Sequence, residues 1–164
     1  MLPIPEPMLA WAAGFFDGEG SVQVTVNRSR SNGLNLPQLT LVVKAANTDR
    51  RALERLQRMF SGSIYLDSAR NKPGRQLHQK LYHWQLAGQR AVPVCRAIIP
   101  YSVIKREQLE LAVSFWDLPW RVASRKGVNM KARKRTDEQL SHELDLASRL
   151  RLMKRNPPSA VEMV

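Results

Sequence analysis

The sequence predicts an α+β fold, in which an antiparallel four-stranded sheet has helices on one face. Three observations support this prediction. An apolar helix opens the chain, two pairs of segments with alternating apolar and polar residues follow it, and segments with helical periodicity come after each pair. The core order is therefore α-β-β-α-β-β-α, followed by further helical segments. Because one loop joins the strands of each pair, neighbouring strands are expected to run antiparallel in one sheet.

The opening helix is expected to begin at Pro5-Glu6-Pro7, since proline is tolerated in the first turn and an acid suits a helix N-terminus. It is apolar almost all round, which is typical of a buried helix. Four residues share one face at i, i+3, i+4 and i+7 spacing and would let a second helix approach closely: Ala10, Ala13, Gly14 and Asp17. Gly18 and Gly20 are expected to cap the helix with unusual dihedral angles, so that Glu19 is presented at a fixed point.

The first strand pair is predicted at residues 21–27 and 38–45, around a turn rich in Ser, Asn and Gly. Polar and apolar residues alternate in both segments, as in half-buried strands, with Val42 as the imperfection in the pattern. The apolar set of the first strand, expected to face inward, is Val22, Val24 and Val26.

A helix is predicted between the two strand pairs, capped by Asn47 or Thr48 and continuing to about Phe60. The second strand pair follows at residues 63–69 and 77–86, around a loop with three basic residues. This pair completes the four-stranded sheet.

Helices are expected at residues 89–98 and 103–116, after which the segment 121–135 contains seven basic residues and no acid. Thr136 then opens a capping box and a terminal helix that runs to about Arg155. This pattern predicts a core domain at residues 1–120, and a basic segment plus C-terminal helix at 121–164 packed on the same domain.

The composition favours a polyanionic partner. Among 164 residues, 26 Lys and Arg against 14 Asp and Glu give a net charge of +12, which is typical of nucleic-acid binding but also occurs in soluble basic proteins. The single cysteine, Cys95, lies in an apolar stretch and is expected to be a buried thiol. No apolar run approaches the ~18 residues of a membrane span, and no signal peptide is evident. We therefore expect an intracellular protein, in a bacterial or phage cytoplasm or an organelle.

The predicted sheet offers a surface suited to double-stranded DNA, because hydrogen-bonding side chains on an open sheet can read base edges in a major groove. The strand residues expected to point outward are Gln23, Thr25, Asn27, Gln38, Thr40, Lys44, His83 and Gln85. The basic residues at the hairpin tips, placed to contact phosphates, are Arg28, Arg30, Arg70, Lys72 and Arg75. Solvent-facing strand positions are also polar in proteins that bind no DNA, so this surface alone leaves the partner open.

The stretch Ala12 to Gly20 resembles the signature helix of the LAGLIDADG homing endonucleases. The match is ordered: Gly14, Asp17, Glu19 and Gly20, with aromatic residues between the first two. The resemblance covers most of residues 8–116, and it implies that the four-stranded sheet reads DNA. The motif occurs once in the chain, which resembles the single-motif, homodimeric type, with the Gly14 face as the dimer seam. Asp17 is assigned to this seam or to a capping role rather than to catalysis.

The resemblance also implies the catalytic residues. Glu19 occupies the position of the family's metal-binding acid, with glutamate in place of aspartate, and Gly18 is assigned with it to the metal. Pro100-Tyr101 begins a segment similar to the one in which the family places an active-site lysine, here Lys105. Arg106 competes for this role, and Ile104 is expected to be buried. Asn47 occupies a place where relatives carry a residue that positions water. The implied cofactor is Mg²⁺ or Mn²⁺, with Ca²⁺ binding without supporting cleavage.

The implied activity is that of an intron-encoded homing endonuclease that cleaves both strands of a long, pseudo-palindromic DNA site by divalent-metal-dependent hydrolysis. Two motifs from two chains would supply the two acids, and the basic segment 121–135 would add phosphate contacts. Two alternatives remain on the same fold: an intron maturase that binds RNA, and a regulator that binds DNA or RNA without cutting it.

Overall fold

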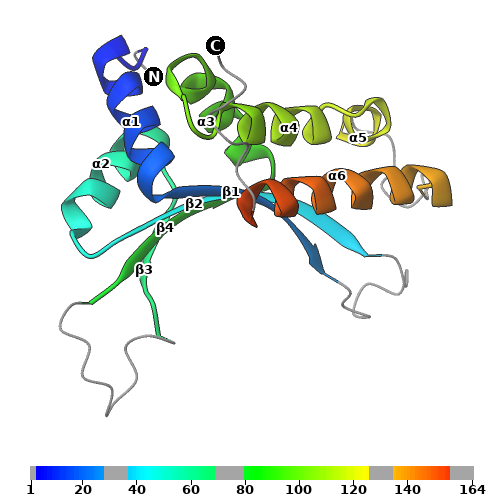
Figure 1. The fold of residues 1–164 in the computed structure, drawn as a ribbon, viewed down its shortest axis with the longest axis horizontal. Helices are drawn as coiled ribbons and strands as arrows, with labels where there is room; N and C mark the ends of the chain where they lie inside the picture. The colour runs from blue at the N-terminus through cyan, green and yellow to red at the C-terminus, as the bar shows by residue number, and fades with distance from the viewer. Residues whose placement is uncertain (1–2, 28–36, 69–79, 126–134, 156–164) are drawn as a thin grey trace.

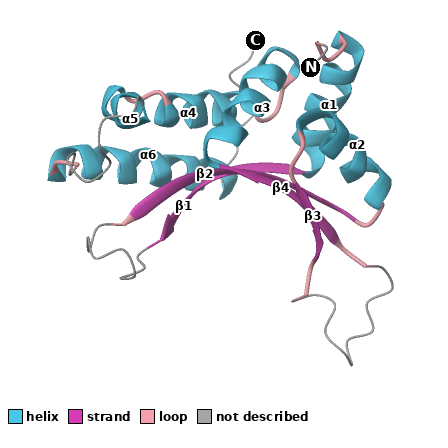
Figure 2. Ribbon diagram, turned by 180° about the vertical axis from the view of Figure 1, so that it is seen from behind, coloured by secondary structure: helices cyan, strands magenta, loops and turns pink. Residues whose placement is uncertain are grey.

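The computed structural model describes residues 3–27, 37–68, 80–125 and 135–155. It confirms the α+β prediction: a four-stranded antiparallel sheet arches beneath the helices, which lie on its convex side (Figures 1 and 2). The strand order is β1-β2-β4-β3, so β1 and β3 are the edges. The strands span β1 Gly20–Asn27, β2 Gln38–Asn47, β3 Ser63–Leu66 and β4 Tyr82–Ala87.

The helices follow the predicted order, with one addition in the basic segment. They are α1 Glu6–Glu19, α2 Arg50–Phe60, α3 Ala91–Ile98, α4 Arg106–Trp116, α5 Pro119–Arg125 and α6 Asp137–Arg155, with 3₁₀ turns η2 Gly88–Arg90 and η3 Ile99–Tyr101. The short helix α5 is the addition. No helix in the described ranges is both long and apolar enough to cross a membrane.

The strand register separates a buried face from an open face. Val22 pairs with Val43, which pairs with Leu86, and all three are buried beneath the helices. The neighbouring row, which contains Lys44, points the other way because side chains alternate along a strand. Val42 belongs to this open face, yet it is only 5% exposed because β1 and β4 flank it at the centre of the sheet.

The core lies between the sheet and the helices. Phe16 from α1, Trp84 from β4 and Phe115 from α4 are each at most 1% exposed. Full burial of one such side chain stabilises the fold by about 1.5–3 kcal/mol. Cys95 is 0% exposed, and burial raises the pKa of its thiol to about 12, so it is a protonated core residue as predicted.

Two helix starts differ from the prediction. The N-cap of α2 is Asp49, whose carboxylate accepts the Arg51 N–H at 2.9 Å, while Asn47 ends β2 and accepts the Asp49 N–H at 2.8 Å. The helix predicted from residue 103 begins at Arg106, because the three preceding backbone N–H groups point to a carboxylate of α1.

The C-terminal helix α6 is part of the core. Its predicted capping box is confirmed, since Thr136 Oγ1 accepts the Gln139 N–H at 3.2 Å and Gln139 Oε1 accepts the Thr136 N–H at 3.1 Å. Its apolar face, which includes Leu146 and Leu150, joins the main core cluster. α6 packs against α4 and β1.

A fully buried carboxylate on α6, Glu143, ties several elements together. It accepts hydrogen bonds from Trp120 at 3.0 Å and from Arg135, and it pairs with Arg121 at 3.1 Å. The two arginines also donate to backbone carbonyls at the start of β2, Arg135 to Pro37 and Arg121 to Leu39. These two members of the basic segment therefore have a structural role, and the phosphate contacts expected of the segment stay a prediction. Residues 126–134 lie outside the described ranges.

Candidate active site and nucleic-acid interface

Glu19 is the last residue of α1, and its side chain is exposed at the point where the chain turns into β1. The turn is tight: a Cβ at Gly20 would lie 2.3 Å from the Phe16 ring. Gly20 has φ −84°, so the expectation of unusual dihedral angles was wrong, and glycine is required here for space. The close packing fixes where Glu19 projects.

The carboxylate of Asp17 holds the segment that precedes α4. Oδ1 accepts the Ser102 hydroxyl at 2.6 Å and the Lys105 N–H at 3.0 Å, and Oδ2 accepts the N–H groups of Val103 and Ile104 at 2.7 and 3.2 Å. Burial acts to raise the pKa of Asp17, but these four hydrogen bonds more than offset it, and the pKa is lowered. Asp17 is thus an ionised anchor within one chain.

The side chain of Lys105 also contacts α1, as a donor to backbone carbonyls at the end of the helix. Its Nζ donates to the carbonyl of Phe16 at 3.0 Å and to that of Asp17, two of the last carbonyls of α1. A cation is favourable at this negative end of the helix dipole. Burial lowers the pKa of Lys105, opposed by the carboxylates of Asp17 and Glu19. The structure therefore brings the predicted lysine and the predicted acid to the same end of α1.

The geometry distinguishes Lys105 from its two neighbours. The guanidinium of Arg106 donates to the Pro100 carbonyl at 3.0 Å, so this competitor is held by the 3₁₀ turn before α4. Ile104 is 66% exposed, so the expectation that it is buried was wrong. It is displaced outward because its backbone N–H turns toward Asp17.

Asn47 and Gly18 receive no comparable support. The Asn47 side-chain oxygen accepts the Asp49 N–H in the turn before α2, and within the described residues no hydrogen bond joins it to Glu19 or Lys105. Its role in positioning water stays a prediction. In the described ranges, no three His, Cys, Asp or Glu side chains gather in a way that could hold a metal. One chain thus offers the Glu19 carboxylate, with the Gly18 backbone carbonyl beside it, as oxygen donors of the kind that Mg²⁺ prefers.

The predicted DNA-reading side chains that the structure describes fall on the open face of the sheet. They are Gln23, Thr25, Asn27, Gln38, Thr40, Lys44, His83 and Gln85, which alternate with the buried residues in the register. Those nearest the β1–β2 hairpin end, Thr25, Asn27 and Gln38, are exposed. The hairpin-tip cations Arg28, Arg30, Arg70, Lys72 and Arg75 lie outside the described residues.

A side-chain network that was not predicted from the sequence lies at the β3–β4 end of the open face. His83 Nε2 lies 3.1 Å from Asp67 Oδ2, and its ring stacks on Tyr65 with 5.3 Å between centroids. The Tyr65 hydroxyl in turn donates to Gln85 Oε1 at 3.1 Å. Tyr65 thus holds two predicted base-reading residues, His83 and Gln85, in place. The alternation of residues in β3 could have predicted that Tyr65 lies on this face.

The structure separates the four residues of the predicted dimer seam by their exposure, and the seam itself stays a prediction. Ala10 and Gly14 are exposed, and a Cβ added at Gly14 would meet nothing within 4 Å. Ala13, at 0% exposure, and Asp17, at 9%, are instead buried against their own chain, so neither side chain is available to a partner. The exposed face of α1 therefore differs from the predicted one, because residues 12, 13, 16 and 17 are buried in the core.

Part of the chain matches a known family model. Residues 12–83 match the family model described as LAGLIDADG endonuclease. The recognition made from the signature helix is thereby confirmed, and the chain has the fold of these endonucleases. A comparison with curated proteins finds no match.

Solved structures of homing endonucleases resemble the chain over most of its length. I-CvuI, in complex with the I-CreI target in the presence of Mg, is 16% identical with a TM-score of 0.67, over 90% of this chain and 82% of that one. I-TnaI is 17% identical with a TM-score of 0.56, over 94% and 98%. I-SmaMI bound to uncleavable DNA is 20% identical with a TM-score of 0.61, over 90% of this chain and 47% of that one.

Proposed function

We propose that the protein is a homing endonuclease that cleaves both strands of a double-stranded DNA site by divalent-metal-dependent hydrolysis. The observation that carries the proposal is the end of α1. There an exposed acid, Glu19, stands beside a partly buried ammonium group, Lys105, at the edge of an open polar sheet. A metal-binding carboxylate and a cation that stabilises charge on the phosphate together can catalyse phosphodiester hydrolysis.

The donor set fits a hard divalent cation such as Mg²⁺. Glu19 and the Gly18 carbonyl would hold it, and when bound it would lower the pKa of a water and neutralise charge on the phosphate. Lys105 would stabilise the negative charge that develops on the phosphate oxygens. Asp17 is a positioning residue, since it fixes the backbone that carries Lys105. Asn47 would orient water.

The proposal includes a homodimer, because one chain supplies one such acid and two strands must be cut. Two observations support it. Ala10 and Gly14 leave an open small-residue face on α1, and Val103 and Ile104, anchored to the same helix end, are 75% and 66% exposed. The chain also corresponds to 47% of the longer I-SmaMI chain. Two-fold symmetry of the protein implies a pseudo-palindromic site.

The test is cleavage of a plasmid that carries the chain's own insertion locus without the insertion. We expect discrete double-strand cutting with Mg²⁺ and none with EDTA. Glu19→Gln, which keeps the side-chain size and removes the charge, should reduce the rate by about a thousandfold or more. Glu110→Gln, an exposed acid on α4, is the matched control and should cut normally.

Other outcomes of this test have defined meanings. Tight binding of the locus without cutting under Mg²⁺ or Mn²⁺ would reject the nuclease and leave the regulator, or the maturase if RNA binds more tightly. Cutting that survives Glu19→Gln would keep the activity but reject the assigned acid.

The dimer is tested by the molar mass in solution. Gly14→Leu should shift the protein from dimer toward monomer, since the new side chain meets open space within one chain but obstructs a close helix seam. Light scattering measures the mass. Ser114→Leu, an exposed position on α4, is the control. An unchanged molar mass for Gly14→Leu would show that the dimer seam does not include Gly14.

A further inference from the structure

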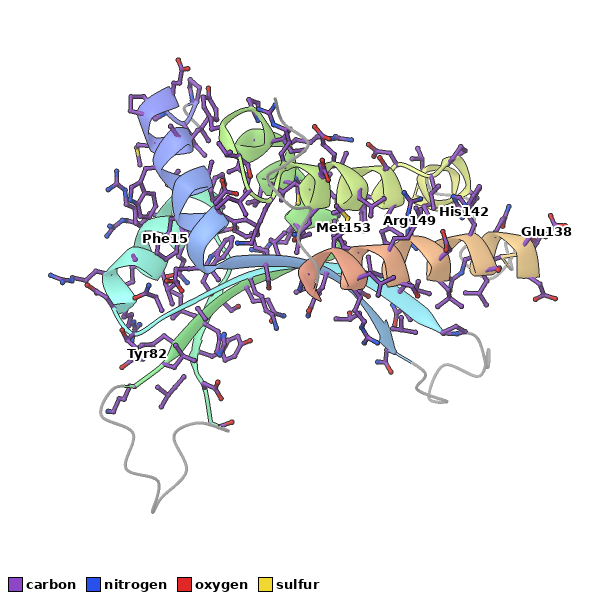
Figure 3. The ribbon with its side chains drawn as sticks, in the orientation of Figure 1. Phe15, Tyr82, Glu138, His142, Arg149 and Met153 are labelled. Atoms are coloured by element: carbon purple, nitrogen blue, oxygen red, sulfur yellow. The ribbon has the colours of Figure 1, made fainter. Side chains whose placement is uncertain are left out.

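The last turns of α6 lie against β1, an edge strand of the sheet (Figures 1 and 3). Lys154 Nζ stands 3.4 Å from the side-chain oxygen of Gln23, which lies in the open-face row of β1. A groove of about 540 Å³ separates the two elements. Its lining from α6 is Leu144, Ala147, Ser148, Arg151 and Lys154, and β1 contributes residues 23–26.

The charges that act on the pKa of Lys154 are of one sign. This pKa is lowered to about 8, first by burial and then by repulsion from Lys44 and Lys105. Lys44 lies on β2 and Lys105 precedes α4, so three elements place ammonium groups near this point. Among the described residues no carboxylate forms an ion pair with Lys154, whose ammonium group donates to the neutral amide of Gln23.

A half-buried cation is costly to hold without a counter-charge. The cost is offset when an anion enters, because its attraction to the ammonium group of Lys154 then opposes the repulsion from Lys44 and Lys105. The two other lysines indicate which anion. Lys44 belongs to the proposed base-reading face and Lys105 to the proposed catalytic end, so a DNA backbone that contacts both places would run close to Lys154.

We propose that Lys154 binds a DNA backbone phosphate in the groove between α6 and β1, with Arg151 lining the same groove. This inference rests on the proposed function, and it makes the last turn of α6 part of the DNA-binding surface. An ammonium group on a flexible stem suits a phosphate oxygen as a point charge and carries no base preference. The contact should therefore add affinity uniformly across target sequences.

The first experiment compares Lys154→Gln with Arg149→Gln. Arg149 is an exposed cation on the same helix that does not line the groove, and it is labelled in Figure 3. Affinity for a duplex of the locus is measured over a series of salt concentrations without metal. Lys154→Gln should weaken binding several-fold and reduce the log–log salt slope by about 0.9, the value for one phosphate contact. Lys154→Arg should restore most of the binding, and the melting temperatures show that each variant is folded.

The second experiment locates the phosphate. Single phosphates of the duplex are replaced in turn by neutral methylphosphonates, and each affinity is measured for the unmodified protein and for Lys154→Gln. At one position, the loss of affinity from the methylphosphonate and the loss from Lys154→Gln should not be additive, because both changes remove the same contact. Losses that add at every position would overturn the inference, as would identical salt slopes for Lys154→Gln and Arg149→Gln.

These failures are distinguishable from failure of the proposed function. Binding is measured without cleavage. If the protein never cuts DNA, the nuclease proposal is rejected, but the salt dependence of binding still tests the role of Lys154. A chain that cuts normally while Lys154→Gln matches Arg149→Gln keeps the nuclease and rejects the phosphate contact.

Discussion

Two buried carboxylates organise this molecule, and they do so with different donors. Asp17 accepts four hydrogen bonds from one short segment, three of them from backbone N–H groups. Within the described ranges, the partners of Glu143 are side chains, those of Trp120, Arg121 and Arg135. Asp17 joins the two segments that carry the proposed acid and lysine, whereas Glu143 joins α6 to α5 and the start of β2.

The difference has a consequence for each region. Backbone donors bring no charge of their own into the interior, so loss of the Asp17 carboxylate leaves unpaired N–H groups. Loss of Glu143 removes the carboxylate that pairs with the guanidinium groups of Arg121 and Arg135, which are 16% and 25% exposed. An unpaired buried charge costs more than an unpaired buried amide. Stability should therefore depend more on Glu143, and cleavage more on Asp17.

The largest expected effect on stability is that of Glu143→Ala. Removing one partner of a buried ion pair costs about 3–5 kcal/mol, so the free energy of unfolding should fall by about that amount. Urea denaturation measures it. Glu138→Ala, an exposed acid near the start of the same helix, labelled in Figure 3, should change stability little. A loss below about 1 kcal/mol for Glu143→Ala would contradict the charge argument.

Asp17→Asn should have the smaller effect on stability and the larger one on cleavage. An amide can accept at one atom only, and its NH₂ would face backbone donors, which costs about 2–3 kcal/mol. The segment before α4 should then shift, and cleavage should fall further than stability explains. Asp117→Asn is the control, since its pair with Arg96 lies on the surface with side chains 41% and 57% exposed. Full cleavage by folded Asp17→Asn would show that Lys105 needs no anchor.

The smallest effect is the pH dependence of stability that the Asp17 carboxylate contributes. Its pKa is lower in the folded chain than the usual value of about 3.9, so it stabilises the fold above that pH. The contribution is lost as pH falls through the lowered folded pKa. Between neutral pH and the acid range, the stability gap between the natural chain and Asp17→Asn should therefore narrow. A series of urea titrations measures this difference in stability. A difference that stays constant with pH would contradict the assignment of Asp17 as an ionised anchor.

Local patterns in the sequence predicted the elements and the faces of the sheet. Alternation in β1 and β2 separated Val22 and Val43 from Gln23 and Lys44, because a strand has only two faces. The capping box at Thr136 and Gln139 located the start of α6 because its bonds span three residues. The signature helix identified Glu19, and the segment after Pro100 identified Lys105, through ordered residues within short stretches.

Long-range contacts decided the rest. The partners of Asp17 lie 85 to 88 positions away, and this contact both delays the start of α4 and turns Ile104 outward. Packing of α1 against the core buried Ala13, which the sequence could not separate from Gly14 on one small-residue face. Lys154 reaches β1 across 131 positions. The sequence by itself determined the periodicity, the capping box of α6 and the signature acid, which are properties of neighbours along the chain. The tertiary structure alone decided which carboxylates are anchors and which cations lie close together, because burial and charge depend on every element that packs around a residue.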